Sequence, residues 1–500
     1  MLQHTQTPTC NVAPKVTESW PTGPHSLPTE IVQMIFQFVF ESCTGSSLSS
    51  KSPALWLDED PLSSFLFPYS LACVCLRWFR ILKTYPIYWT RQVITVDIIA
   101  TSLNAARTML EWAGNLPLKV IVTRHHGTSE TLASERTNVG HAMQLLRPYI
   151  SRIWSLSFDL EHRSSIPALW RESGRARQLK VLTLMGRFDA SRISSHCESS
   201  HEYEGKLEVP RLQQVTLNSH FLKNALMAHP RLARWFEHMT ALTICGDAAS
   251  DGNVISLHKF LSVIDIFPSL HELMIEDIRF DGNVPAPSLF MLRPAVLRLR
   301  NITGKTALRG ILPARVGRSR DVITIIDCII HGFLDPCSDT HFSCAHLTIA
   351  SMGLTARIED LVSRWEGERL TLMGCNRVSR VLFQCLHGEN APMCLSHLRI
   401  VDCDNFSAGD VISLVKSRES QAASTSLMDV PDDDAFTALT ESHVQGRGPS
   451  ISLQRATWLA EHVDTFVWDT VARDGLRYVW DGFIEKLRVL PTSGSTKVRR

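Results

Sequence analysis

The sequence predicts an α/β protein in which a small helical domain is followed by a solenoid, with a curved parallel sheet on the inside and helices on the outside. Two observations indicate this fold class. Two short segments near the N-terminus carry apolar residues at helical spacing on more than one side. Farther along, ten segments with the pattern apolar-x-apolar recur about every 27 residues, a period typical of strand-plus-helix repeats.

The composition is that of an ordinary globular protein, and it restricts the classes of function. Hydrophobic residues make up 44% of the chain, charged residues 20%, and the formal net charge is +1. This balance argues against a generally basic nucleic-acid-binding protein, so we expect no nucleic-acid partner. The chain opens without a secretory leader pattern, and its most apolar stretch, 65–76, is too short to span a bilayer. We therefore expect no membrane partner and a cytoplasmic or nuclear location, or both.

The first helix follows a polar, Pro-containing segment, 1–25, that we expect to be disordered. Pro28 suits a first helical turn, and Glu30 complements the helix dipole there. The apolar residues of the helix form two stripes. One stripe consists of Ile31, Met34, Ile35, Phe38 and Val39, and the other of Val32, Phe36 and Phe40. A helix with two apolar sides must bury both.

The second helix is predicted after a Ser-rich loop insertion at 41–68, with Ser70 as its N-cap. It too has two apolar stripes. One contains Leu71, Val74, Cys75, Trp78 and Leu82, and the other Ala72, Leu76 and Phe79. A unit of about 65 residues buries only ~60% of its chain surface, so the surplus indicates a partner protein or a large neighbouring domain.

The repeated segments define the rest of the chain. Each ends near one of Phe158, Leu184, Leu217, Ile244, Ile275, Leu299, Ile325, Ile349, Leu372 and Ile400. They should form ten parallel strands paired in chain order. Two less regular units, 107–124 and 141–158, each read as a helix followed by a strand. In the last copy, 395–415, Cys403 follows the strand at a tight turn. Cys328 and Cys375 occupy the same position in their own copies. A small side chain such as that of cysteine fits at this turn.

The domain boundaries follow from these patterns. The helical domain covers 26–94, and the solenoid 95–415. A Ser-rich, acidic segment at 416–450 is expected to be a flexible insertion. Residues 451–490, with Trp458, Trp468 and Trp480, are expected to form a helical C-terminal cap, and 491–500 a disordered tail.

The segment 27–94 resembles the F-box, the motif that docks substrate receptors onto the Skp adaptor of cullin-based ubiquitin ligases. Leu27-Pro28 with Glu30-Ile31 look like the opening of the family's motif, and Ile35-Phe36 like its first-helix anchor. Val74, Cys75 and Trp78 look like its central V-C-x-x-W, and Pro86 with Trp89 like its closing P-x-L-W. Two departures are the long loop at 41–68 and Tyr88 in place of the closing Leu.

The resemblance implies an adaptor-binding surface made of Leu27, Pro28, Glu30, Ile31, Ile35, Phe36, Leu71, Val74, Cys75, Trp78, Phe79 and Trp89. The stretch 115–158 is further similar to the region after the F-box in mushroom-type fungal F-box proteins with degenerate leucine-rich repeats. Together these likenesses imply a leucine-rich-repeat-like solenoid behind the F-box. The other interpretation of the two helices is an ordinary cap on the solenoid.

The function implied by the resemblance is that of the substrate-recognition subunit of a Skp–cullin–F-box ubiquitin ligase. Its partners would be a Skp-type adaptor, through it a cullin, and a target protein. It would carry out no chemistry itself and would need no cofactor. Two alternatives stay open: an adaptor-bound scaffold that does not cause degradation, and an enzyme on a repeat scaffold.

Motifs for an enzyme are incomplete in this sequence. The segment "NITGKT", 301–306, resembles the end of a phosphate-binding loop, but Leu299 stands where the loop needs its first glycine. His271-Glu272 lacks the second histidine of a zinc protease helix, and no G-x-S-x-G elbow is present. We therefore expect no catalytic residues and no metal site.

The inner face of the predicted sheet is the remaining candidate surface. Side chains alternate along a strand, so residues beside the apolar framework should point to this face. The charged residues among them are Glu272, Glu276, Arg298, Arg300, Arg369 and Arg399. Repeat arrays bind partners on such a face, and we expect the target protein to contact it between Glu272 and Val401.

Overall fold

The computed structural model shows a mixed α/β protein with one large, mainly parallel sheet. It describes residues 27–44, 60–63, 66–97, 100–125, 131–167, 169, 174–188, 207–222, 235–246, 254–281, 294–304, 307–312, 321–329, 341–352, 357–376, 378–387, 392–426, 436–472, 476–481 and 486–491. The expected disorder of 1–25 and of most of the tail lies outside these residues. None of the helices described is both long and apolar enough to cross a lipid bilayer.

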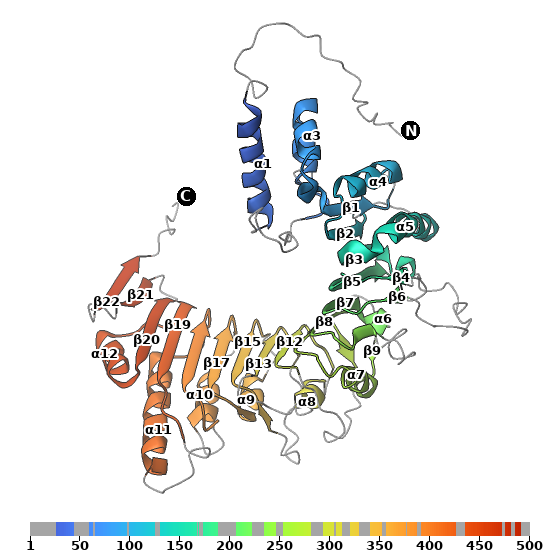
Figure 1. Cartoon of the computed structure of the whole chain (residues 1–500). Coiled ribbons are helices and arrows are strands. Elements are labelled where there is room, and N and C mark those ends of the chain that lie inside the picture. The colour runs from blue at the N-terminus through green and yellow to red at the C-terminus, as the bar shows by residue number, and fades with distance from the viewer. Residues whose placement is uncertain are drawn as a thin grey trace, which may run out of the picture. The chain divides into compact units, whose positions relative to one another are not determined.

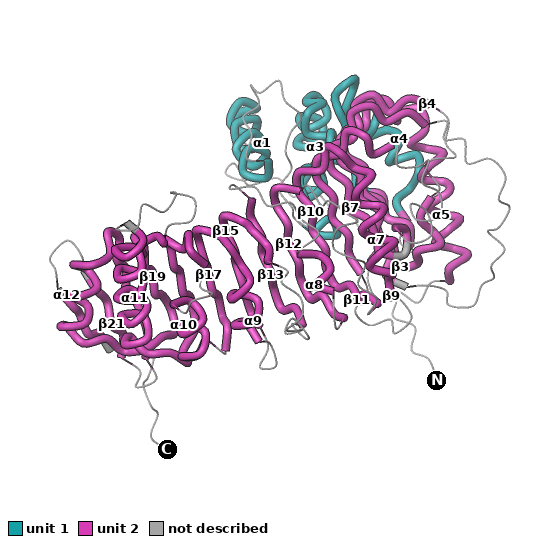
Figure 2. Tube along the Cα trace, turned by 90° about the horizontal axis from the view of Figure 1, so that it is seen from below, with its two compact units in different colours: residues 1–93, 101–119 teal, residues 94–100, 120–500 magenta. Residues whose placement is uncertain are grey.

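The chain divides into two compact units, which Figure 2 colours separately. The first comprises 1–93 with 101–119, and the second comprises 94–100 with 120–500. The boundary passes through two strands, β1 (Arg91–Thr95) and β2 (Leu118–Thr123). The predicted start of the solenoid at 95 is therefore wrong for 101–119. These residues join the first unit because Trp112 packs on Phe79 and Trp89, with ring centroids 5.3 and 4.7 Å apart.

The first unit is built from short helices. They are α1 (Thr29–Thr44), α2 (Tyr69–Ala72), α3 (Leu76–Lys83), the 3-10 helix η2 (Pro86–Trp89) and α4 (Leu103–Trp112). Helix α1 begins at Thr29, directly after Pro28, which was predicted in its first turn. It runs through 41–44, which were expected in the loop. Leu66 and Phe67, at the other end of that predicted loop, are buried; residues 45–59 lie outside the described part.

The second helix was predicted as one continuous element, but it is broken into α2 and α3. Ser70 lies inside α2 rather than capping it, and the chain leaves the helix before Cys75, whose backbone is extended at φ −163° and ψ 163°. Val and Cys are weak helix formers, so interrupting the helix at this point costs little free energy. The predicted stripe from Leu71 through Val74 to Trp78 therefore does not exist as one helical face.

An aromatic cluster forms the core of the first unit. Phe40 and Phe67 both pack on Tyr88, with ring centroids 5.3 and 5.1 Å away, and Phe36 packs edge-on against Trp78 at 5.2 Å. The indole N–H of Trp89 donates to the carbonyl oxygen of Leu82 at 3.0 Å. Tyr88, which replaces the Leu of the F-box pattern, is almost completely buried here.

The second unit contains the ten predicted strands. They are β3 (Ile153–His162), β5 (Val181–Phe188), β7 (Gln214–Asn218), β8 (Ala241–Cys245), β10 (Glu272–Glu276), β12 (Val296–Arg300), β13 (Val322–Ile326), β15 (His346–Ala350), β17 (Arg369–Met373) and β18 (His397–Val401). All ten pair in parallel and in chain order, which confirms the prediction of strand order and direction. In Figure 1 these strands follow one another along a curve.

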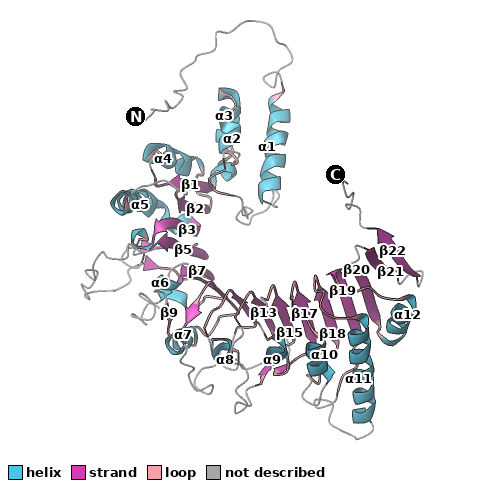
Figure 3. Cartoon of the chain, turned by 180° about the vertical axis from the view of Figure 1, so that it is seen from behind, coloured by secondary structure: helices cyan, strands magenta, loops and turns pink. Residues whose placement is uncertain are grey.

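The remaining elements complete the sheet and cover one of its faces. The helices are α5 (Leu132–Leu146), η3 (Arg147–Arg152), η4 (Arg163–Ser165), α6 (Ser219–Phe221), α7 (Leu257–Ile264), α8 (Ala307–Ile311), α9 (Ile358–Val362), α10 (Arg380–His387), α11 (Ala408–Ser426) and α12 (Leu453–His462). Helices α7 to α11 lie on the outer side of the curve in Figure 3. Three two-stranded sheets join β4 (Gly174–Arg175) to β6 (Leu207–Glu208), β9 (Val254–Ile255) to β11 (Arg279–Phe280), and β14 (Phe342–Ser343) to β16 (Trp365–Glu366).

A left-handed residue follows each of six strands of the large sheet, β10, β12, β13, β15, β17 and β18. These residues are Asp277, Asn301, Asp327, Ser351, Gly374 and Asp402, with φ between 48° and 58°. Asn, Asp and Gly tolerate this region best, so the sequence suits the turn. Cys328, Cys375 and Cys403 come next and are buried, as predicted. The thiol of Cys375 donates to the carbonyl oxygen of Ile349 in the previous repeat at 3.4 Å.

The C-terminal part of the second unit differs from the prediction. Helix α11 continues to Ser426, and β19 (Glu441–Arg447) pairs in parallel with β18, so 416–426 and 436–450 are not a flexible insertion. The predicted helical cap contains a single helix among its described residues. After α12 come β20 (Thr465–Val471), β21 (Leu476–Asp481) and β22 (Lys486–Pro491), and the last two pair antiparallel. Trp468 and Trp480 thus lie on strands, where side-chain alternation along the strand buries them.

Candidate functional site

Helix α1 presents one apolar stripe to the interior and another to solvent. Val32, Phe36 and Phe40 are 0% exposed. On the other side, Ile31, Met34, Ile35 and Phe38 are 41, 65, 37 and 71% exposed. The spacing i, i+3, i+4, i+7 places these four side chains on one face. We call them the α1 stripe. The first unit therefore has its own core and still leaves a large apolar surface on this helix.

The residues predicted to bind an adaptor fall into three groups. Pro28, Glu30, Ile31, Ile35 and Val74 are exposed, and Leu27, Leu71, Cys75, Trp78 and Phe79 are partly buried. Phe36 and Trp89 are completely or almost completely buried in the core. These two shape the unit and cannot contact a partner directly in this conformation, which corrects the prediction for them.

Three exposed apolar residues were missing from the predicted surface. Met34 and Phe38 belong to the α1 stripe, and Leu76 is 61% exposed at the start of α3. The periodicity of α1 had already put Met34 and Phe38 beside Ile31 and Ile35, so the sequence contained their signal. Leu76 had also been placed in an apolar stripe, with Ala72 and Phe79, but its exposure depends on the break before α3.

The face of the sheet opposite the helices is the second candidate surface, and all six predicted target-binding residues lie on it. Leu273 and Ile275 of β10 are buried, whereas Glu272, Met274 and Glu276 alternate with them on the other side. The same alternation holds through β18, and the strands pair in register without a shift. We call this side the open face.

The six charged residues separate into neutralised and unneutralised groups. Arg298 lies 3.3 Å from the carboxylate of Glu272, and Arg300 lies 3.6 Å from that of Glu276. Arg369 and Arg399 are also exposed, but no described carboxylate lies within ion-pair distance of either guanidinium. Arg399 Nη2 donates instead to the side-chain oxygen of Gln445 at 3.3 Å.

Histidines adjoin the two unneutralised arginines. In the register of the sheet, Arg369 lies between His346 and His397. Partial burial and then the charge of Arg369 lower the pKa of His346. On the other side, Glu441 lies 3.4 Å from both His397 Nε2 and His443 Nε2. The sequence analysis did not include these histidines among the candidate residues, because their spacing in the sequence matches no ligand motif.

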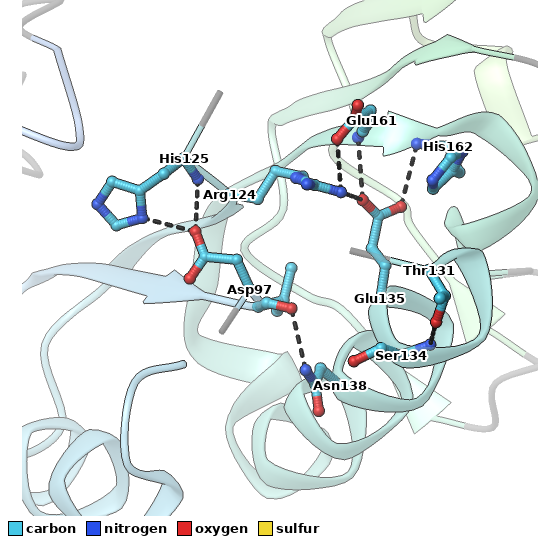
Figure 4. Close-up of polar contacts among 10 residues, drawn as sticks. Asp97, Arg124, His125, Thr131, Ser134, Glu135, Asn138, Glu161 and His162 are labelled. Atoms are coloured by element: carbon cyan, nitrogen blue, oxygen red, sulfur yellow. Dashed lines mark hydrogen bonds and ion pairs between the residues drawn. The ribbon is translucent and has the colours of Figure 1, made fainter. Parts of the chain in front are cut away.

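A buried polar network lies at the start of the second unit and is drawn in Figure 4. The carboxylate of Glu135 on α5 accepts from Arg124 Nη1 at 2.9 Å and from the backbone N–H groups of Glu161 and His162 at 3.2 and 3.0 Å. Arg124 also contacts the Glu161 carboxylate at 2.6 Å. The contacts hold α5 against the end of β3 and the residue after β2, so the network has a structural role.

An Asp–His pair lies beside this network in Figure 4. Asp97 Oδ2 accepts from the backbone N–H of His125 and lies 2.6 Å from its ring Nδ1. The Asp97 side chain is buried and that of His125 is 41% exposed. Nearby, Asn138 Nδ2 donates to the carbonyl oxygen of Val96 at 3.0 Å. Among the described residues, no three His, Cys, Asp or Glu side chains gather as metal ligands.

No protein-family model and no curated protein sequence matches this chain. Function therefore has to be inferred from the two exposed surfaces, the α1 stripe and the open face.

Proposed function

We propose that this chain is the substrate-recognition subunit of a Skp–cullin–F-box ubiquitin ligase. The first unit would be an F-box-like domain that binds a Skp-type adaptor and, through it, a cullin. The second unit would be a leucine-rich-repeat-like solenoid that binds the target protein. The observation that carries the proposal is the α1 stripe: the first unit buries Phe36 and Phe40 completely and still exposes four large apolar side chains on the same helix.

The size of this stripe supports a protein partner. Moving one large apolar side chain out of water contributes about 1.5–3 kcal/mol, so two or three of these residues could dominate the affinity of a complex. Val74 and Leu76, 50 and 61% exposed, add apolar surface around the break between α2 and α3. Both lie in the segment that resembles the V-C-x-x-W part of an F-box.

The proposed role requires no chemistry from the chain. Holding an adaptor on one unit and a target on the other would raise the effective concentration of the target near the ubiquitin-transferring enzyme. Such a subunit would work in the cytoplasm or the nucleus. A scaffold that binds the same adaptor without causing degradation would use the same surfaces, and it would differ because its bound target would not be ubiquitinated.

The test is co-purification of the full chain with a Skp-type adaptor. Met34→Glu with Phe38→Glu places two charges on the α1 stripe and should abolish capture. Gln33→Glu with Gln37→Glu adds the same charge to the same helix beside the stripe and should leave capture within about twofold. Circular dichroism and melting temperature check that both variants fold. If the wild-type chain captures no Skp-type adaptor, the proposal is wrong.

A further inference from the structure

The charges of the open face are unevenly compensated along the sheet. Arg298 and Arg300 of β12 form ion pairs with Glu272 and Glu276 of β10, at 3.3 and 3.6 Å. On β17 and β18, Arg369 and Arg399 are exposed, and no described carboxylate lies within ion-pair distance. The strands β13, β15, β17 and β18 contain no Asp or Glu at any position. On the next strand, β19, Glu441 lies opposite His397 in the register, so the nearest acidic side chain across the sheet contacts a histidine and not either arginine.

The two arginines are diagonal neighbours. Arg369 pairs in register with His397, and Thr371 pairs with Arg399. Strand spacing and residue rise place the Cα atoms of the two arginines about 8 Å apart, so both long side chains can reach one group between them. The ring of His397 is held between Ser396 Oγ, 2.6 Å from its Nδ1, and Glu441 Oε2, 3.4 Å from its Nε2. We call Arg369, Thr371, His397 and Arg399 the quartet.

Two uncharged stripes cross the same strands beside the quartet. Thr324, Thr348 and Thr371 lie opposite one another on β13, β15 and β17. Two residues farther along each strand, an apolar stripe consists of Ile326, Ala350, Met373 and Val401, paired in the same register. Met373 is 42% exposed. Arg399 continues the threonine row, Arg369 lies in the row of His346 and His397 beside it, and the apolar stripe flanks the threonine row on its other side.

We propose that an extended acidic segment of the target protein binds across β13 to β18, with a carboxylate between Arg369 and Arg399 and apolar side chains on the Ile326–Val401 stripe. Guanidinium groups donate in a fork that matches a carboxylate, which favours this anion at the quartet. Three strand spacings of ~4.8 Å correspond to about four or five residues of extended chain. The apolar stripe beside the cations fits a mixed acidic and apolar peptide better than a nucleic-acid backbone.

The assignment of this segment to a protein that is ubiquitinated rests on the proposed function. The binding of an acidic segment to Arg369 and Arg399 does not rest on it. The pKa of His346 is lowered by burial and then by the charge of Arg369, which places this guanidinium close to the ring on the same face. The paired arginines of β12, Arg298 and Arg300, supply a matched control, because they lie on the same face and carry the same charge.

The experiment selects random 12-residue peptides by phage display on the purified full chain. Enriched peptides should contain both acidic and apolar residues. Fluorescence anisotropy with the best synthetic peptide should show at least tenfold weaker binding when its Asp and Glu are replaced by Asn and Gln, and weaker binding at high salt. Arg369→Gln with Arg399→Gln should weaken binding at least tenfold. Arg298→Gln with Arg300→Gln removes the same charge and should change it less than threefold.

Several outcomes would overturn the inference. These are enrichment of no acidic peptide, equal binding of the amide peptide, or equal loss in both arginine variants. The adaptor assay separates this inference from the proposed function. Acidic-peptide binding through Arg369 and Arg399 without adaptor capture would leave the inference standing and reject the ligase role. Adaptor capture without peptide binding would do the reverse.

Discussion

Arg418 of α11 is completely buried and donates from Nη1 to the carbonyl oxygen of Pro392 at 2.7 Å. The same guanidinium donates from Nε to the carbonyl oxygen of Thr437 at 3.1 Å and from Nη2 to that of Leu395 at 3.0 Å. Burial lowers the pKa of Arg418 to about 10, which leaves the side chain charged at neutral pH. A cation in the middle of a Ser-rich segment therefore fastens α11 to the chain on both sides of β18.

Replacing this cation should loosen the C-terminal repeats. Arg418→Met leaves several buried carbonyl groups without donors, so we expect a loss of about 2–4 kcal/mol of local stability. Hydrogen exchange of the β18 and β19 amides measures the effect without requiring two-state unfolding of the whole chain. Arg380→Met, at an exposed position of α10, should change protection by less than about 0.5 kcal/mol. Unchanged protection in the Arg418 variant would contradict the fastening role.

Substitution of two phenylalanines on α1 should have different effects, one on folding stability and the other on adaptor binding. Phe36 is 0% exposed and Phe38 is 71% exposed. Phe36→Ala should destabilise the first unit by about 3–5 kcal/mol, because it empties space in a packed core. Phe38→Ala should change stability by less than about 0.5 kcal/mol but weaken adaptor capture at least fivefold. Thermal melting and co-purification on the same preparations check both, and a Phe38 variant that binds normally would exclude this residue as an anchor.

The buried network around Glu135 should respond strongly to truncation. Glu135→Ala removes one carboxylate from Arg124 and leaves two backbone N–H groups without an acceptor, so we expect a destabilisation of about 3–5 kcal/mol. Urea unfolding monitored by circular dichroism measures it. Arg136→Ala, at the next and exposed position of α5, is the control and should be nearly neutral. A mild effect at Glu135 would show that the network contributes little to folding.

The pairing of β20 with β21 should depend on pH through one ion pair. Arg477 donates to both oxygens of Asp469 at 2.8 Å, and these hydrogen bonds lower the pKa of Asp469 below its ordinary value. A lowered pKa in the folded state means that the stabilisation is complete above about pH 4 and is lost as the pH falls through the folded-state pKa. Asp469→Asn should therefore weaken β21 protection at pH 7 more than at pH 3. Asp464→Asn, exposed and outside the pair, should show no such difference.

The strands were predictable because their signal is local. Leu297 and Leu299 face the core, as do Leu398 and Ile400, and each pair alternates with residues that point to solvent. This alternation is visible in a window of five residues. The register of the sheet follows, because a slip by one residue would expose the whole buried set. The open face, including Arg369 and Arg399, came from the same alternation.

The parts that were not predicted depend on contacts distant in sequence. Nothing near Arg418 shows that its donors will meet carbonyl groups from Pro392 to Thr437, so a polar composition was interpreted as a linker. Arg124 and Glu135 read as surface charges until the fold brings them together. On α1, the periodicity gave two apolar stripes. The packing of Phe40 on Phe67 and Tyr88, and of Phe36 on Trp78, decides which stripe points inward.

The separation of packing from exposure in every strand also bears on how this protein can change through evolution. Buried residues such as Leu273, Ile275, Leu347 and Ile349 are constrained by packing against the adjoining repeats. The residues that alternate with them on the open face, from Glu272 on β10 to Val401 on β18, contact mainly water and the next strand. Each of these can therefore be substituted at little cost to the free energy of folding. Mutations on the open face can therefore change the binding specificity of the protein while the residues of the buried face stay the same.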